Sequence, residues 1–167
     1  LIFILLSFPL LGTEFFHYGL KNGLPDNRVN CYYQDRFGML WMGTASGLAR
    51  FDGIHFYTFL SDESDSLGLA ENYINNIFPF NDDIILITTG SGYLIEYRYS
   101  TGKFVNLSIN KDIRKIYWRR GFKMKNGEIW YSTGNGIALL NKNLKNATEI
   151  PISFLHKEKT QSYAVHD

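Results

Sequence analysis

Residues 41–48 read WMGTASGL, and related stretches recur at residues 86–93 (LITTGSGY) and 130–137 (WYSTGNGI). Successive copies begin 45 and 44 residues apart. The match extends upstream, where an aromatic side chain recurs as Tyr33, Phe78 and Phe122. Self-similarity at a fixed period of this length is typical of solenoids, propellers and other repeat arrays. The chain is therefore predicted to consist of three copies of one structural unit.

Each copy is predicted to form four short strands separated by tight turns. The turn signals in the first copy are Gly38, Gly47 and the pair Asp52-Gly53, because these residue types tolerate a positive φ. No stretch of the chain shows sustained helical spacing. In the first copy the expected strands cover residues 28–34, 39–44, 47–51 and 55–59. A period of 44–45 residues with four strands indicates an all-β fold, an incomplete β-propeller of about three four-stranded antiparallel blades.

The length of 167 residues suits one domain, yet it holds only about three such blades. Propellers close with roughly four to eight blades, so the isolated chain is expected to be an open arc that aggregates or pairs with a second copy. The predicted organisation is a lead-in or outer strand at 13–23, blades at 24–60, 61–108 and 109–152, and the start of a further repeat or a tail at 153–167.

The first eleven residues read LIFILLSFPLL and carry no charge. Such a run is too short to cross a hydrocarbon core of ~30 Å as a helix, but it matches the apolar core of a secretory signal. Residues 1–12 are therefore predicted to be a partial signal peptide. A buried first strand is the alternative interpretation of the same run.

Most of the repeated residues are expected to build the scaffold and to take no part in chemistry. Large rings at Trp41 and Trp130 suit the wedge between neighbouring blades, and the small Gly43 lets the next sheet approach. Threonine hydroxyls just before the turns are expected to bond nearby backbone groups. The full scaffold set comprises Gly38, Trp41, Gly43, Thr44, Gly47, Asp52, Thr89, Gly92, Gly127, Trp130, Thr133 and Gly136.

Three runs of the first copy resemble the two-component regulator propeller repeat: residues 23–29 (GLPDNRV), 34–44 (QDRFGMLWMGT) and 47–53 (GLARFDG). The second copy departs from that pattern at Leu86, and the third at Ser132 and Asn141. The resemblance implies an N-terminal fragment of the periplasmic sensor region of a bacterial hybrid two-component histidine kinase. It further implies export, phosphorelay signalling by the parent protein, a homodimeric parent, contacts with the remaining propeller blades, and oligosaccharide ligands.

Ligand contact is expected on the face that carries the loops into each inner strand and the turns between the second and third strands. Aromatic side chains there can stack on a sugar ring. The candidate ligand-binding residues are Arg28, Tyr73, Arg114, Tyr117 and Trp118. Lys111 to Lys125 also form a basic run, with seven cations against one acid. This run indicates either a site for an anionic sugar or a solvated outer rim, and nucleic acid is not expected to bind an exported segment.

No catalytic constellation, metal site or cofactor motif is expected. The net charge of +1 argues against a protein whose main task is to coat nucleic acid or an anionic membrane. The four histidines lack metal-ligand spacing, and the single cysteine, Cys31, is interpreted as a small packed residue. The alternatives to a sensor are a propeller enzyme acting on glycans, as a lyase or hydrolase, and a non-binding structural or oligomerisation module.

Overall fold

The computed structural model of the protein describes residues 15–62, 68–107, 121–132, 136–141, 144 and 147–151. The predicted signal peptide at 1–12 and the segment 153–167 lie outside these residues. Twelve β-strands and one short 3-10 helix, η1 (Leu20–Asn22), make up the described secondary structure. Within this part of the chain, no helix has the length and apolar character needed to cross a membrane.

The strands form three antiparallel four-stranded sheets, each in sequence order, which we call blades 1 to 3. Blade 1 contains β1 (Val29–Gln34), β2 (Leu40–Thr44), β3 (Leu48–Phe51) and β4 (Phe56–Phe59). Blade 2 contains β5 (Ile74–Pro79), β6 (Ile84–Thr89), β7 (Leu94–Arg98) and β8 (Lys103–Leu107). Blade 3 contains β9 (Gly121–Lys123), β10 (Ile129–Ser132), β11 (Gly136–Leu140) and β12 (Ala147–Pro151). The predicted all-β fold of about three blades is thereby confirmed, and the strands predicted for blade 1 agree with the structure within one residue.

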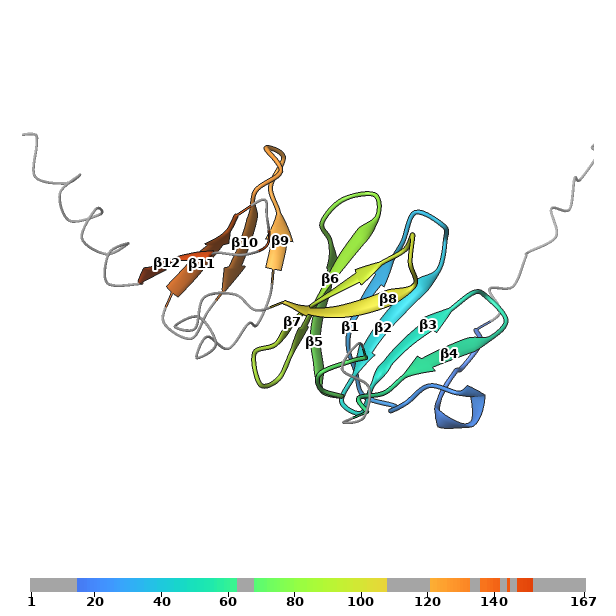
Figure 1. The fold of residues 1–167 in the computed structure, drawn as a ribbon. Coiled ribbons are helices and arrows are strands. Elements are labelled where there is room, and N and C mark those ends of the chain that lie inside the picture. Colours follow the sequence, from blue (N-terminus) through green and yellow to red (C-terminus); the bar gives the residue numbers. More distant parts are fainter. Residues whose placement is uncertain are drawn as a thin grey trace, which may run out of the picture.

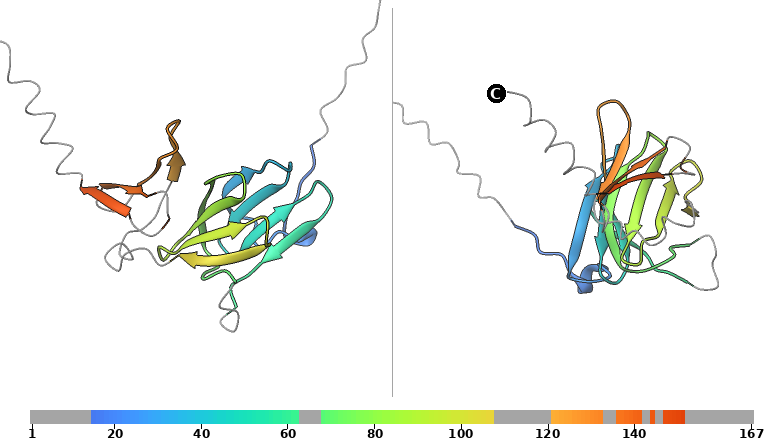
Figure 2. Two further views of the ribbon diagram at one scale, coloured as in Figure 1. Left: turned by 45° about the horizontal axis from the view of Figure 1, so that its top comes forward. Right: turned by 90° about the vertical axis from the view of Figure 1, so that its left-hand side faces the viewer.

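Blade 2 lies between blades 1 and 3, and the first strand of each sheet is its inner strand (Figures 1 and 2). The neighbouring inner strands are joined by asparagine side chains. Asn30 Nδ2 donates to the carbonyl oxygen of Ile74 at 2.8 Å, and Asn76 Nδ2 donates to that of Gly121 at 3.2 Å. Strands β1 and β5 also share a register shift, between Val29 and Cys31 in one and between Ile74 and Asn76 in the other. The repeat therefore extends to local irregularities of the sheets.

The lead-in to blade 1 differs from the outer strand that was one prediction for residues 13–23. In the described part, residues 15–23, the only regular element is η1. The Tyr18 ring packs at 5.0 Å from Phe51 and 5.7 Å from Phe56, measured between ring centroids. Leu24 is buried with Met42 and Ala49 in the same cluster. Side-chain packing on one face of blade 1, and not strand pairing, holds this segment.

The predicted turn chemistry is present in the structure. Gly38 and Gly127, equivalent in blades 1 and 3, have φ values of 81° and 84°, which favour glycine. Asp52 Oδ1 accepts hydrogen bonds from the amides of Ile54 at 2.8 Å and His55 at 2.6 Å, which closes the β3–β4 hairpin. These amide bonds, with that of His55 the strongest, lower the pKa of Asp52 to about 2.

The threonine hydroxyls bond the β2–β3 and β6–β7 turns, as predicted. Thr44 Oγ1 donates to the carbonyl oxygen of Gly47 at 2.7 Å, and Thr89 Oγ1 accepts from the amide of Tyr93 at 3.1 Å. The turn glycines Gly47 and Gly92 both have a positive φ. The corresponding Thr133 lies outside the described residues, and Gly136 begins β11.

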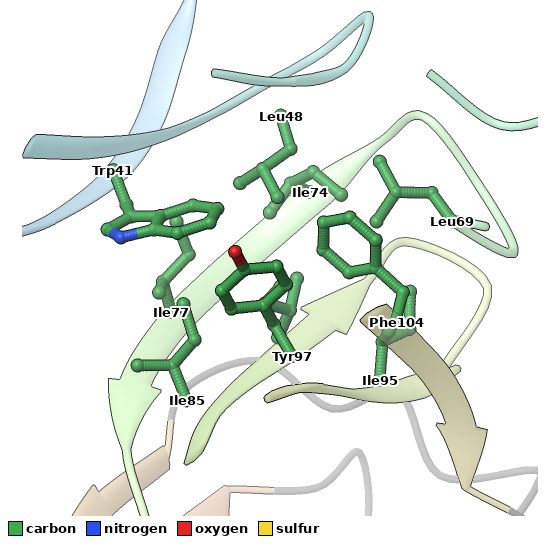
Figure 3. Close-up of a cluster of buried hydrophobic side chains, with 10 residues drawn as sticks. Trp41, Leu48, Leu69, Ile74, Ile77, Ile85, Ile95, Tyr97 and Phe104 are labelled. Atoms are coloured by element: carbon green, nitrogen blue, oxygen red, sulfur yellow. The ribbon is translucent and has the colours of Figure 1, made fainter. Parts of the chain in front are cut away.

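Trp41 fills the space between blades 1 and 2. Its side chain is fully buried, and its ring lies 4.8 Å from the Tyr97 ring (Figure 3). The Phe59 ring of blade 1 lies 5.8 Å away, measured between ring centroids. Close approach of the two sheets depends on Gly43, because a Cβ there would lie 2.5 Å from Cγ2 of Ile74. Trp41 therefore lies between the two blades, and Gly43 faces the neighbouring sheet.

Asp35 orders the β1–β2 turn beneath Trp41, a role that sequence reasoning missed. Its buried carboxylate accepts from the amides of Phe37 at 2.9 Å and Met39 at 3.0 Å, and from Trp41 Nε1 at 2.8 Å. A buried carboxylate is tolerated where it is hydrogen-bonded in this way. One side chain thus sets both the turn and the orientation of the indole ring.

Blades 2 and 3 share a second cluster, in which Phe78 and Leu86 pack with Ile129 and Tyr131. The Phe78 and Tyr131 rings meet edge to face at 5.5 Å. Trp130, the blade 3 counterpart of Trp41, is only partly buried, and its Nε1 donates to Oε2 of Glu128 at 3.1 Å. Trp130 was predicted to fill a wedge between blades, but among the described residues no further blade covers its ring.

Candidate ligand-binding face

Two of the predicted ligand-binding residues, Arg28 and Tyr73, come together at the boundary between blades 1 and 2. They hold the same place in the repeat, just before β1 and β5. The guanidinium carbon of Arg28 lies 5.5 Å from the centroid of the Tyr73 ring. A guanidinium above an aromatic face at this distance is a cation–π contact. Equivalent positions of successive repeats thus form one pair across the blade boundary.

Beside this pair, blades 1 and 2 each carry an acidic side chain that accepts a hydrogen bond from a serine, in the β2–β3 turn and in the β6–β7 turn respectively. In blade 1, Ser46 Oγ donates to Asp26 Oδ2 at 2.8 Å. In blade 2, the amide and the hydroxyl of Ser91 donate to the two Glu71 carboxylate oxygens at 2.8 and 3.1 Å. The sequence analysis missed both pairs, although the acid lies 20 residues before the serine in each copy. We call them the acid–serine pairs.

Both acid–serine pairs hold a carboxylate at the rim. The amide of Arg28 donates to Asp26 Oδ1 at 2.8 Å, and this bond, followed by that of Ser46, lowers the pKa of Asp26. The carboxylate is therefore charged at neutral pH. Because hydrogen-bond donors of the protein bind each carboxylate, its orientation is fixed in the absence of a ligand.

The backbone around Tyr73 leaves its ring partly open. The amide of Gly90 donates to the Tyr73 carbonyl oxygen at 2.8 Å, so the loop is tied to the β6–β7 turn. A Cβ at Gly90 would lie 3.0 Å from Tyr73 Cδ1, and the absence of a side chain there makes room for the ring. The Tyr73 side chain remains 37% exposed, which leaves aromatic surface for a ligand.

The other three candidate ligand residues, Arg114, Tyr117 and Trp118, lie outside the described residues. So does most of the basic run from Lys111 to Lys125. Its described end includes Lys123, whose Nζ donates to the Phe80 carbonyl oxygen at 2.6 Å. The structure therefore places two of the five candidates, and it places them together.

The chemistry of the described face is that of recognition. It offers an aromatic ring, a guanidinium, two oriented carboxylates and two serines. Among the described residues, no group of three or more His, Cys, Asp and Glu side chains is arranged to hold a metal ion. Burial raises the pKa of Cys31 to about 11, against a weaker opposing hydrogen bond from the Gly43 amide. Its thiol is therefore protonated at neutral pH, which fits a packed residue and not a nucleophile.

Comparison with known proteins agrees with this architecture. The fold defines the chain as part of a β-propeller, and residues 23–46 match the family model described as "Two component regulator propeller". Over these residues the chain is similar to the two-component regulator propeller family. A search of curated protein sequences finds no match.

Solved propeller structures share the fold. The extracellular domain of BT3049 from B. thetaiotaomicron, described as a hybrid two component system, is 26% identical with a TM-score of 0.71, over 82% of this chain and 20% of that one. The extracellular domain of BT4673 from the same organism, described as a one component system, is 21% identical with a TM-score of 0.64, over 81% and 21%. A catalytically inactive virginiamycin B lyase from Staphylococcus aureus shares the fold at 15% identity and a TM-score of 0.57, over 77% and 43%. The chain spans about a fifth of the two extracellular domains.

Proposed function

We propose that this chain is a ligand-recognition segment in the exported sensor region of a two-component signalling protein, and that it has no catalytic activity of its own. Support comes from the regulator propeller repeat and from the similarity to an extracellular domain of a two component system. The described face supplies groups for recognition, and no catalytic set is evident among the described residues. Histidine kinase activity and phosphorelay would belong to the parent protein. This segment would lie on the periplasmic side of the membrane.

The proposed ligand is an oligosaccharide. The observation that supports it is the Arg28–Tyr73 pair, an aromatic ring held at a blade boundary with part of its surface open. Apolar faces of sugar rings stack on aromatic side chains, while carboxylates and serines accept and donate hydrogen bonds to sugar hydroxyls. The acid–serine pairs place such groups on either side of the boundary. Both kinds of contact are therefore available at one place.

Isothermal titration with a panel of neutral and acidic oligosaccharides tests this proposal. Tyr73→Ala is expected to weaken binding about tenfold or more, because truncation of a central aromatic anchor costs about 2 kcal/mol. Tyr32→Ala is the matched control. Tyr32 is 76% exposed and pairs with Met42, on the side of blade 1 opposite to Trp41. Equal binding by Tyr73→Ala and wild type, or an equal loss in Tyr32→Ala, would overturn the proposal.

The proposed partners are the remaining blades of the parent chain and, in the parent, a second copy of the protein. Trp130 is partly exposed and large side chains such as Phe122 (53%) are open on blade 3. Exposed apolar faces of terminal repeats promote association. The chain on its own is expected to sediment as oligomers or aggregates. A monodisperse monomer that unfolds cooperatively would contradict this expectation.

A further inference from the structure

A polar pocket of about 120 Å³ opens at the other end of the blades from the Arg28–Tyr73 pair. The pair precedes the inner strands, whereas the pocket lies where β1 and β5 end. All three blades contribute to its lining, with Tyr33 and Arg36 from blade 1, Asn81, Asp82 and Tyr99 from blade 2, and Lys123 from blade 3. Because three repeats line this pocket, it forms only when the blades pack together.

Both cations of the pocket are held by contacts with neighbouring groups. Lys123 Nζ donates to the Phe80 carbonyl oxygen at 2.6 Å, which draws the side chain from blade 3 toward blade 2. The Arg36 guanidinium carbon lies 4.5 Å from the centroid of the Phe37 ring, and that ring packs edge to face on Tyr99 at 5.3 Å. One donor of Lys123 is thus used by the protein, while an ammonium carries three.

Two tyrosines line the pocket, and both phenols are neutral. Burial, with a smaller contribution from the nearby charge of Asp35, raises the pKa of Tyr99 far above its ordinary value. The same two causes, burial first, raise the pKa of Tyr33. Both hydroxyls therefore keep their protons at neutral pH, but the Tyr99 hydroxyl is buried near Asp35, so Tyr33 is the phenol that can donate to an acceptor in the pocket.

The charges that line the pocket and its volume indicate which groups it can bind. Two cations and one carboxylate, Asp82, line the pocket. The buried Asp35 carboxylate lies behind the phenols and already accepts three hydrogen bonds from its own turn and from Trp41. A pocket of about 120 Å³ has room for a carboxylate or sulfate group.

We propose that this pocket binds a compact oxyanion group, a carboxylate or a sulfate, through Arg36 and Lys123, with Tyr33 as a hydroxyl donor. The site is separate from the face proposed above to bind oligosaccharide, and it does not depend on that proposal. Guanidinium and ammonium groups recognise such anions by charge-assisted hydrogen bonds. Binding would also link blade 1 to blade 3, because Tyr33 and Arg36 come from the first and Lys123 from the third.

Nuclear magnetic resonance titration of the full chain tests the site, with acetate and inorganic sulfate as probes and acetamide as the neutral counterpart of acetate. The backbone amide signals of Arg36, Asn81 and Lys123 are the reporters. Acetate or sulfate is expected to give saturable shifts at these residues, and acetamide is not. Arg36→Gln and Lys123→Gln should each weaken binding about tenfold, because hydrogen bonds to charged groups are worth about 1.5–3 kcal/mol.

Two matched variants control for general charge effects. Lys125→Gln removes a lysine from the β9–β10 turn that does not line the pocket, and Arg28→Gln removes an arginine from the other end of the blades. Both should bind the anion as wild type does, and Lys123→Arg should retain binding. Saturation by acetate alone or by sulfate alone identifies the preferred head group. Equal shifts with acetamide, no saturable shift with either anion, or an equal loss in Lys125→Gln would each overturn the proposal.

Discussion

Trp41 and Trp130 occupy the same place in the repeat, yet their surroundings differ completely. Trp41 is fully buried against Tyr97 of blade 2, and Asp35 accepts its indole hydrogen bond. Trp130 is partly exposed, and the partner of its indole nitrogen is Glu128 of its own blade. The comparison teaches that the repeat supplies a large ring at this position, whereas the adjacent sheet buries it. The stabilising unit of this molecule is the pair of neighbouring blades.

Removal of the two rings should produce the largest difference. Trp41→Ala is expected to reduce the free energy of unfolding by about 3–5 kcal/mol, the usual cost for a buried aromatic side chain. Trp130→Ala should cost about 1–2 kcal/mol, because less surface leaves water on folding. Urea unfolding followed by circular dichroism measures both. Amide hydrogen exchange should show loss of protection in blades 1 and 2 for Trp41→Ala and in blade 3 alone for Trp130→Ala.

Equal costs for the two tryptophan variants would break the comparison. They would mean that each ring stabilises its own sheet and that contact between blades adds little. A loss of protection spread over all three blades in both variants would point instead to a single cooperative unit.

Gly43 and Gly127 are expected to be required for different reasons, Gly43 for the close approach of two blades and Gly127 for a turn. A Cβ at Gly43 would lie 2.5 Å from both Cys31 Sγ and Ile74 Cγ2, so Gly43→Ala should cost about 1–3 kcal/mol by overpacking. Gly127 has open space around it and a φ of 84°, so Gly127→Ala should cost about 1–2 kcal/mol through backbone strain alone.

A third variant distinguishes these two mechanisms. Asn tolerates a positive φ, so Gly127→Asn is expected to be close to neutral in thermal unfolding. Gly43→Asn should be worse than Gly43→Ala, since a longer side chain meets the same neighbours. A neutral Gly43→Ala would show that blades 1 and 2 can move apart at little cost.

The smallest expected effect concerns the β3–β4 turn of blade 1. Hydrogen bonds from the amides of His55 and Ile54 lower the pKa of Asp52 from its ordinary 3.8 to about 2. A lowered pKa in the folded state means that Asp52 stabilises the fold above about pH 4 and that this contribution is lost as the pH falls through 2. Asp52→Asn, which introduces the residue type of Asn141 in blade 3, should flatten the pH dependence of the melting temperature between pH 4 and pH 2. An unchanged slope would show that the hydrogen bonds to the Asp52 carboxylate are no stronger in the folded protein than in the unfolded one.

Much of this architecture follows from local signals in the chain. The period of 45 and 44 residues, the turn glycines and the pair Asp52-Gly53 predicted four-stranded blades and, in blade 1, strand ends within one residue. Turn geometry and strand propensity act over a few residues, so a single sequence carries them. The role of Asp35 had a local signal as well, an acid six residues before Trp41, but its meaning depends on burial.

Contacts between blades could not be derived in the same way. Arg28 meets Tyr73, Asn30 meets Ile74 and Lys123 meets Phe80, and the members of each pair lie 43 to 45 residues apart. Which side chains meet across that separation depends on the twist of each sheet and on the small residues that set the distance between sheets. The amino-acid pattern therefore determined the strands, the turns and the repeat. Only the packing of one blade on the next decided the Arg28–Tyr73 pair, the burial of Trp41 and the three-blade pocket.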